Sequence, residues 1–581
     1  MTNAAPRAAE PSTRLTHRQI ITILIGLMMG MFLAALDQTV VSTAIRTIAD
    51  DLHGLEHQAW ATTAYLITAT ISTPLYGKLS DIYGRKRFFS TAIAIFLIGS
   101  VLASFATSME QLAVFRAVQG LGAGGLFSLA LAIVGDIVPP RERAKYQGYF
   151  LAVFGTASVI GPVVGGFFAG ANSLMGLDGW RWVFLVNVPF GLAALVVVQR
   201  TLKLNHTRLD HRIDWLGALM LSTGLVPLLL VAEQGRDWGW SSSSALTCYV
   251  IGATALVLFV LQERRMGREA LLPLSLFANP TVRVASIASV LLGMAMFGGL
   301  ALLPLYLQIV KGATPTEAGL LLLPMTLGIM VGSITAGQAI SRTGRYRIFP
   351  IVGSGLLAVA LLGLHWIGAD TPLWITMALM MLFGLGLGGN LQPLTLAVQN
   401  AVPAHMIGVA TSSATFTRQM GGTIGTALFL TVLFGQVPDK ITQSFQSVAS
   451  TPAFQQALAQ PANASFAEQF GSGPSGGTQA SNAVLTDSSF LSTLDPTLAR
   501  PFLVGFSEAM DVVFLLAAGV ALVCFLVMLA LPEVTLRAGS AYDERADADA
   551  DAGELAQTPS TTESPERTRA RGRHRVTAAS S

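Results

Sequence analysis

The chain has 581 residues, of which 52% are hydrophobic and only 12% are charged, whereas a soluble domain carries about 25% charged residues. This composition excludes an ordinary soluble globular protein and indicates a polytopic membrane protein. The formal net charge of +3 excludes little, because in such a protein the placement of the charges matters more than their sum.

About fourteen apolar stretches are long enough to cross a bilayer, because a helical span needs about 20 mostly apolar residues. No stretch shows the alternating pattern of a barrel strand, so the expected fold class is all-α. The expected spans, in chain order, are 20–45, 59–78, 88–107, 111–135, 146–170, 181–199, 213–232, 245–262, 284–307, 316–340, 348–367, 373–398, 409–435 and 509–531.

Lysine and arginine gather in alternate connectors between these spans, and most of the other connectors hold one basic residue or none. The positive-inside rule places the basic connectors and both tails in the cytoplasm. We therefore expect a multi-pass protein of the cytoplasmic membrane that begins with a cytoplasmic tail at 1–18. Arginine greatly outnumbers lysine, which indicates a bacterium with a GC-rich genome.

Asp37 is the only acidic residue well inside the spans of the first half. An uncompensated charge at the bilayer centre costs about 2.5–3.5 kcal/mol on insertion scales, so Asp37 must be paired, hydrated or protonated. Arg116 is the nearest candidate partner, because span one runs outward and span four runs inward, which brings both residues to a similar depth. The two residues form either a structural ion pair or a protonation site whose titration follows access to water and to Arg116.

The connector 77–89 reads GKLSDIYGRKRFF and places an acid and a basic cluster between spans two and three. The acid lies near the end of span two, where the basic cluster can interact with it and with the C-terminal dipole of the helix. Such contacts can hold one conformation and release in another, so we expect a conformational switch. Its residues are Gly77, Asp81, Gly84, Arg85 and Arg87.

The same pattern returns at 337–349 as GQAISRTGRYRIF, with Ser341 in place of the acid, so the two loops cannot be equivalent. The stretch 120–139 likewise returns at 384–403, and such repeats indicate a duplicated unit. Since an even number of additional spans separates the copies, the halves form parallel repeats with a transport path between them. The expected organisation is a first six-helix bundle at 19–200, two additional helices at 213–262 and a second six-helix bundle at 283–531.

The repeated stretch contains the pattern GxGxxG in both copies, at 120–125 and 384–389. Neither copy follows a strand, so the context for phosphate binding is missing, and we expect these glycines to serve close helix packing. The chain has no GxxxxGK[ST] motif, so ATP is not its energy source, and coupling to an ion gradient remains. No nucleophile–base set or metal-ligand spacing supports an enzyme or a metal site.

Two segments are expected outside the membrane. The connector 436–507 is rich in Ser, Gln, Ala and Gly, which predicts partial disorder; it is either functional or a tolerated insertion. The tail 533–581 runs from acidic to basic, which is typical of a disordered, solvated segment. Glu508 and Asp511 mark the outer mouth of the last span, where they either attract cations or belong to a solvated helix start.

Arg418 lies near the middle of span thirteen, with no acid of the second half positioned to pair with it. An unpartnered arginine in the membrane is a functional candidate by default, although carbonyl contacts or a water-filled cavity would also satisfy it. Other polar and aromatic residues of the spans can line the same cavity. The expected cavity residues are Tyr65, Asn390, Gln392, Phe416 and Arg418, with Asn187 and Gln419 as further candidates.

Several motifs together resemble the major facilitator superfamily, and within it the fourteen-span drug:proton antiporters. The connector 77–89 is similar to the superfamily's loop signature, LDQTVVSTAI to the span-one motif that carries Asp37, and WRWVFLVNVPFG to the entry of span six. LAVFRAVQGLGAGG resembles the span-four signature whose arginine, here Arg116, is linked to proton transfer. GTASVIGPVVGGFF resembles the span-five antiporter signature associated with export, whose residues here are Gly155, Gly161, Pro162, Gly165 and Gly166.

The resemblance implies the major facilitator fold and a secondary transporter, not an enzyme, that works by alternating access. It implies proton-coupled export of a hydrophobic, cationic drug or toxic compound, with protons and membrane lipids as further partners and no role for nucleic acid. We expect a monomer that needs no cofactor and is driven by the proton gradient. Two alternatives stay open: an exporter of an endogenous lipid or secondary metabolite, and a non-transporting membrane sensor or assembly factor.

Overall fold

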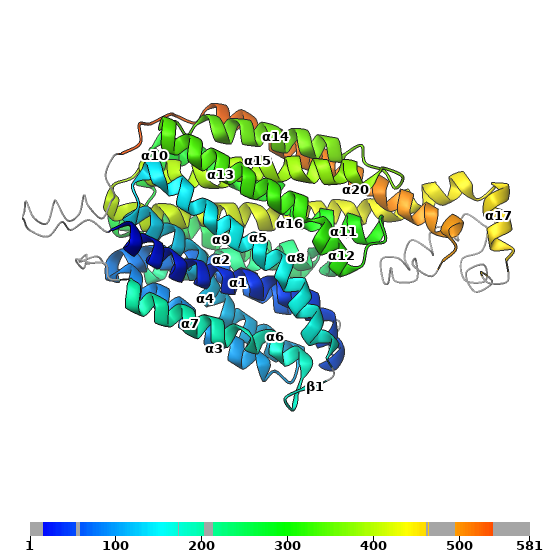
Figure 1. Ribbon diagram of the computed structural model, residues 1–581, viewed down its shortest axis with the longest axis horizontal. Helices are drawn as coiled ribbons and strands as arrows, with labels where there is room; N and C mark the ends of the chain where they lie inside the picture. The colour runs from blue at the N-terminus through cyan, green and yellow to red at the C-terminus, as the bar shows by residue number, and fades with distance from the viewer. Residues whose placement is uncertain are drawn as a thin grey trace, which may run out of the picture.

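The computed structural model describes residues 16–53, 58–171, 173–202, 213–460, 463 and 494–537, and most of these residues are helical (Figure 1). Nearly all of the two predicted tails, and the middle of the predicted connector 436–507, lie outside the described residues. Within the described part, twelve segments are long and apolar enough to cross a membrane. The helix α2 and the shorter apolar helix α14 bring the crossings to the predicted fourteen, so the all-α membrane fold is confirmed.

The helices form two bundles of six crossings each, which lie one above the other in Figure 1. The first bundle comprises α1 (His17–Asp51), α2 (Gln58–Tyr83), α3 (Arg85–Ser104), α4 (Met109–Ile137), α5 (Pro140–Gly170) and the stacked pair α6 (Trp182–Leu185) and α7 (Asn187–Thr201). The second comprises α11 (Pro280–Ile309), the pair α12 (Pro315–Leu321) and α13 (Leu323–Thr343), α14 (Ile348–Leu364), α15 (Leu373–Asn400), α16 (Ile407–Val448) and α20 (Pro496–Leu529). Short elements outside the crossings are the hairpin β1 (Ser173–Leu174) and β2 (Leu177–Asp178), α10 (Ser275–Ala278) and α17 (Pro452–Leu458).

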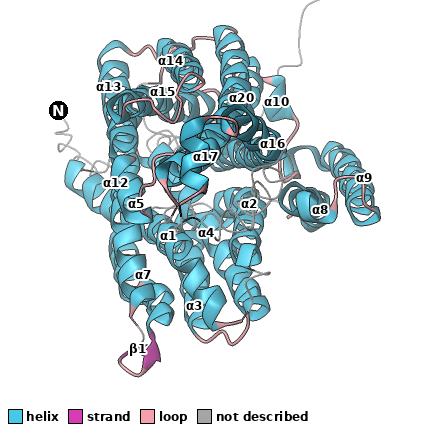
Figure 2. Ribbon diagram, turned by 90° about the vertical axis from the view of Figure 1, so that its right-hand side faces the viewer, coloured by secondary structure: helices cyan, strands magenta, loops and turns pink. Residues whose placement is uncertain are grey.

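Of the two additional helices, α8 (Trp215–Trp238) stands beside α2 and α16 at the edge of the bundles, and α9 (Ser243–Met266) packs on its outer side (Figure 2). Leu221 and Leu225 of α8 share one buried hydrophobic cluster with Ile67 and Ile71 of α2 and Phe416 of α16. The α8–α9 hairpin therefore packs across the seam between the first bundle and the second.

The repeated glycines bring helices together in the same way in both bundles. Gly120 and Gly124 of α4 lie directly against the backbone of α2, at Tyr65 and Ala69, while the intervening Gly122 faces α3. In the second bundle the corresponding glycines of α15 lie against α13 and α14; these are Gly384, Gly388 and Gly386. A side chain at any of these positions would collide with the neighbouring backbone, so the expected packing role is confirmed, and α4 and α15 are structural counterparts.

The helices extend further into the predicted connector 436–507 than the sequence-based boundaries. The helix α16 continues to Val448 and α20 begins at Pro496. The extension is held by an apolar stripe at helical spacing, because Val437, Ile441 and Phe445 are all buried. The Phe445 ring meets that of Phe502 in α20 edge to face, with centroids 4.8 Å apart. The sequence analysis assigned this stretch to a connector because polar residues separate the apolar ones.

Candidate functional site

A fully buried ion pair lies inside the first bundle. Arg116 of α4 donates from Nη1 to Oδ2 of Asp37 in α1 over 2.5 Å, and the two side chains are only 1% and 0% exposed. Removing one member of such a pair leaves an uncompensated buried charge, which costs about 3–5 kcal/mol. The structure therefore confirms the predicted partnership.

The carboxylate of Asp37 receives further hydrogen bonds from two helices, α4 and α7. Gln119 of α4 and Asn187 of α7 each donate a side-chain N–H to Oδ1 over 2.7 Å. Gln119 also donates to Ser100 Oγ of α3 over 2.7 Å and accepts from Arg116 over 2.6 Å. Both carboxylate oxygens of Asp37 are thus hydrogen-bonded, as a buried carboxylate requires. The sequence analysis missed Gln119 and Ser100, although Gln119 follows Arg116 by three residues and so shares its helix face.

Tyr65 of α2 belongs to this pair rather than to an open cavity. Its ring lies under the Arg116 guanidinium, 4.2 Å from centroid to Cζ, and its side chain is buried. Arg116 Nε completes its contacts by donating to the carbonyl of Ala61 over 3.3 Å. Helices α1, α2, α3, α4 and α7 therefore all meet at one charge pair, so a change in the protonation of Asp37 would be felt across the first bundle.

A second charge cluster lies at the end of the bundles where the basic connectors gather, which we call the basic end. Arg85 pairs with Asp81 over 2.5 Å and with Asp136 of α4 over 2.7 Å. The other oxygen of Asp81 accepts a hydrogen bond of 2.8 Å from the backbone N–H of Val409, in the first turn of α16. Asp81 thus joins the first bundle to the N-terminus of a helix in the second, where a negative charge is stabilised by the helix dipole.

The neighbouring glycines allow this contact between the bundles. Gly77 lies directly against Ser412 of α16. Gly84 separates α2 from α3 with φ of 100°, a conformation that strongly favours glycine. Arg87 is exposed and lies outside the charge cluster. The sequence analysis missed Asp136, whose position at the same end of α4 was the available signal.

Another polar contact at the basic end also joins the bundles. Gln399 of α15 donates to the carbonyl of Leu131 in α4 over 3.1 Å, and Arg143 Nη1 donates to Gln399 Oε1 over 3.4 Å. Arg143 is anchored by donating from Nε to the carbonyl of Val138 over 2.7 Å. The two bundles are therefore in contact at the basic end in this structure.

The glycines of the predicted antiporter motif seat α5 between α1 and α13. Gly161 lies against Thr39 and Gly165 against the Val40 carbonyl, both in α1. Gly155 faces the side chain of Thr326 in α13. Pro162 lies near Gly319 of α12, whereas Gly166 is exposed with open space around it. The helix α5 thus touches both the helix that carries Asp37 and the second bundle.

The structure separates the residues that the sequence analysis assigned to one cavity. Asn390 is fully buried and donates to the Gly386 carbonyl over 2.7 Å, beside α14. Phe416 is buried in the cluster with α8, and Gln392 is also buried. Asn187 and Tyr65 belong to the Asp37 site. Asn390, Phe416, Asn187 and Tyr65 therefore contact different neighbours, and their shared role as a cavity lining stays a prediction.

Arg418 of α16 differs from these residues. Its side chain is partly exposed although many protein atoms surround it. Within the described part of the chain it has no acidic or hydrogen-bonding partner. At 1.5 Å per residue it stands about 16 Å along the helix from Ile407, near the middle of an apolar core about 30 Å thick. An unpaired charge at this depth requires water or a ligand.

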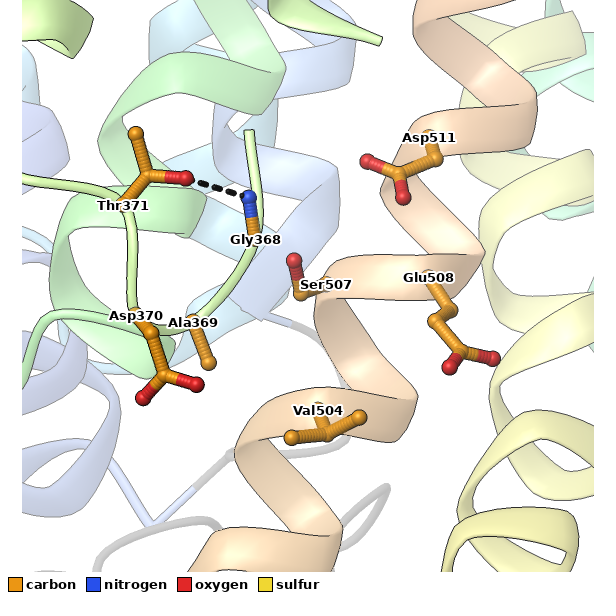
Figure 3. Close-up of a pocket in the computed structure, with 8 residues that line it drawn as sticks. All are labelled: Gly368, Ala369, Asp370, Thr371, Val504, Ser507, Glu508 and Asp511. Carbon is orange, nitrogen blue, oxygen red and sulfur yellow. Dashed lines mark hydrogen bonds between the residues drawn. The ribbon is translucent and has the colours of Figure 1, made fainter. Parts of the chain in front are cut away.

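A pocket of about 440 Å³ opens at the opposite end from the basic connectors. Figure 3 shows the residues that line it. It is lined by the loop after α14 and by α20, and its acids are Asp370, Glu508 and Asp511. Lys440 of α16 lies 3.5 Å from Glu508. All of the lining residues belong to the second bundle, so the pocket that contains Glu508 and Asp511 is separate from the Asp37 pair.

Comparisons with known proteins agree with this architecture. A family model described as the Major Facilitator Superfamily matches residues 27–426. The chain is 34% identical over 537 residues to an uncharacterized MFS-type transporter of Mycobacterium tuberculosis (strain ATCC 25618 / H37Rv), covering 92% of this chain and 72% of the relative. It is 35% identical over 416 residues to the multidrug transporter protein MdtP of Bacillus subtilis (strain 168), covering 71% and 75%. The solved proton:xylose symporter XylE shares the fold, with a TM-score of 0.56 at 14% identity over 92% of this chain and 100% of that chain.

Proposed function

Because the chain belongs to the major facilitator superfamily of secondary transporters, we propose that it exports hydrophobic small molecules from the cell in exchange for protons. The observation that carries this proposal is the Asp37–Arg116 pair, a fully buried charge pair in the first bundle. The similarity to a multidrug transporter supports export as the direction. The protein is then a monomer of the bacterial cytoplasmic membrane whose basic end and both tails face the cytoplasm.

Proton coupling works through the packing of the first bundle. The ionised Asp37 holds Arg116, Gln119 and Asn187 in place; once protonated, it loses most of its attraction for Arg116. The helices α1, α4 and α7 are then free to rearrange, and α5 transmits the change because it contacts both α1 and α13. Each proton that enters supplies about 2.3 kcal/mol per 100 mV of membrane potential, in addition to the pH difference.

Alternating access requires that the basic end open and close. The contact of Asp81 with the start of α16 stabilises the state described here, in which the bundles touch at the cytoplasmic face. Release of that contact lets the bundles separate at the cytoplasmic end, so that a substrate can enter between them. Protonation of Asp37 from the outside, after the substrate has left, then favours the return.

The test uses proteoliposomes with an imposed pH gradient, an internal pH indicator and two permanently charged probes with one apolar body, a pyrenylbutyl trimethylammonium and a pyrenylbutyl sulfonate. We expect the wild type to move at least one probe while consuming the gradient, and Asp37→Asn to lose the linked proton flux because the amide cannot ionise. Asp178→Asn serves as the control, because that carboxylate is 49% exposed and outside the site. Normal proton-linked transport by Asp37→Asn would refute the coupling role of this residue.

The second candidate is export of an endogenous lipid or secondary metabolite. The extension formed by the end of α16, α17 and the start of α20 favours it, because a folded structure beyond the membrane can receive a released amphiphile. Absence of proton flux with either probe, in protein shown to be folded and inserted, would favour this candidate. The expected cationic charge of the substrate stays a prediction, which the paired probes test directly.

A further inference from the structure

Arg418 differs from Arg116, the other basic side chain that the described residues place near the middle of a crossing. Arg116 is paired with Asp37, and Arg85 with Asp81 and Asp136. Arg418 has no such partner in the described chain, yet part of its surface is open. A lone charge at mid-membrane depth is retained only where water or a ligand meets it.

Apolar side chains of α11 pack on the stretch of α16 that follows Arg418. Gly293 of α11 lies directly against the Arg418 carbonyl. Within the next two turns Gly422 lies against Phe297, and Gly425 against Met294. Both Phe297 and Met294 are partly exposed, and methionine and aromatic side chains adapt to varied apolar ligands. On α16 itself Thr417 and Gln419 flank Arg418, so the positive charge lies among polar residues of its own helix, and apolar residues of α11 begin within the next turn.

At the depth of Arg418, the described residues offer no free carboxylate to a cationic substrate. Among the described residues near the middle of the membrane, Asp37 is the only carboxylate, and both of its oxygens are already bonded to Arg116, Gln119 and Asn187. A cationic substrate would find no free acid there. A substrate with an acidic group would find an arginine, whose planar guanidinium matches sulfonate, carboxylate and phosphate oxygens.

We propose that Arg418 is the recognition residue for an anionic head group, so that the transported compounds are acidic amphiphiles. The inference rests on the proposed export function and gives it a substrate class. The acid can belong to a free organic compound or to a lipid head group, since both present the same chemistry to arginine. The exit of a monoanion and the entry of one proton each make the interior more positive, so one cycle moves two charges. A more negative interior should therefore accelerate export.

Binding is measured on the full chain in detergent, so that its result does not depend on transport. The probes are the pyrenylbutyl sulfonate, the matched trimethylammonium and a short-chain fluorescent phosphatidate, followed by fluorescence anisotropy. We expect the wild type to bind at least one anion more tightly than the cation, and Arg418→Gln to lose about tenfold or more in affinity for that anion. Arg418→Lys should retain part of it. Arg342→Gln, which removes an exposed arginine at the end of α13, should leave all affinities unchanged.

The thermal midpoint of the unliganded protein separates recognition from a structural role. If Arg418 is unpartnered, Arg418→Gln should unfold at the same or a higher temperature than the wild type, because a desolvated charge is removed. A lower midpoint with unchanged anion binding would overturn the proposal, as would equal or tighter binding of the cation by the wild type, or binding of none of the probes. Sulfonate binding without phosphatidate binding would identify free organic acids as the source, and the reverse would identify lipids; either supports the proposal. Loss of proton-linked transport with intact anion binding would refute the export mechanism and leave the anion site standing.

Discussion

The buried charge of Asp37 depends on several side chains from different parts of the chain. Gln119 and Asn187 both donate to one carboxylate oxygen, while Arg116 donates to the other. Because these donors come from α4 and α7, ionised Asp37 ties three helices together. The same residue can therefore serve both stability and coupling, and the two roles can be separated by mutation.

A double-mutant cycle tests the pair. Arg116→Gln should destabilise the protein by about 3–5 kcal/mol, because it leaves Asp37 charged, buried and without its cation. Adding Asp37→Asn should recover much of this loss, because the orphaned charge is removed with it. Thermal or denaturant unfolding in detergent measures both. Additive losses in the double variant would show that the two residues do not act as a pair.

At the scale of the element, α5 is the helix that links the Asp37–Arg116 pair to the second bundle. Its glycines remove the side chains that would hold it away from α1 and α13. Thr39, two residues from Asp37, donates to the Ala157 carbonyl of α5 over 3.1 Å. Movement of α1 at Asp37 therefore reaches α5 directly.

Gly161→Ala tests this contact. The added methyl group would collide with the Thr39 hydroxyl, so we expect a loss of about 1–3 kcal/mol in stability, as is typical of overpacking, together with slower export. Gly166→Ala is the matched control, because it lies on the same helix with nothing near it. Its stability should be unchanged or slightly raised, since alanine favours helix more than glycine does. Equal effects of the two variants in unfolding and transport assays would count against the close approach.

At the scale of the whole molecule, the two repeated loops have different tasks. The first, through Asp81, contacts the other bundle. In the second, Arg347 donates to the Leu529 carbonyl of α20 over 2.7 Å, within its own bundle. The replacement of the acid by Ser341 thus accompanies a loop whose Arg347 braces its own bundle.

Asp81→Asn should weaken the closed state at the basic end. Loss of the charge at the start of α16 and of the pair with Arg85 is worth about 1–2 kcal/mol, which shifts the ratio of closed to open molecules about 5- to 30-fold. Distances between spin labels at the exposed Thr91 and Thr343 report this shift. Ser341→Ala, the equivalent position of the second loop, should leave the distances unchanged. An unaltered distance distribution in Asp81→Asn would show that other contacts keep this end closed.

Features that depend on the cost of moving groups into lipid could be predicted from the sequence. The fourteen crossings follow from hydropathy over about 20 residues. The pairing of Asp37 with Arg116 follows from the cost of a lone charge and from the depth of each residue in its span. The packing role of the repeated glycines follows from their place inside apolar helices.

The tertiary structure alone decided which polar side chains meet. A helix that is apolar on all sides gives no periodic signal of the direction in which its polar residue points. Asn390 and Asn187 were therefore indistinguishable in sequence, although one packs beside α14 and the other bonds Asp37. The sequence by itself thus determined the number of membrane crossings, the duplication and the need to pair Asp37, because these follow from composition along the chain. Only the packing of rotated helices determined the partners Gln119, Ser100 and Asp136, and left Arg418 without a partner among the described residues.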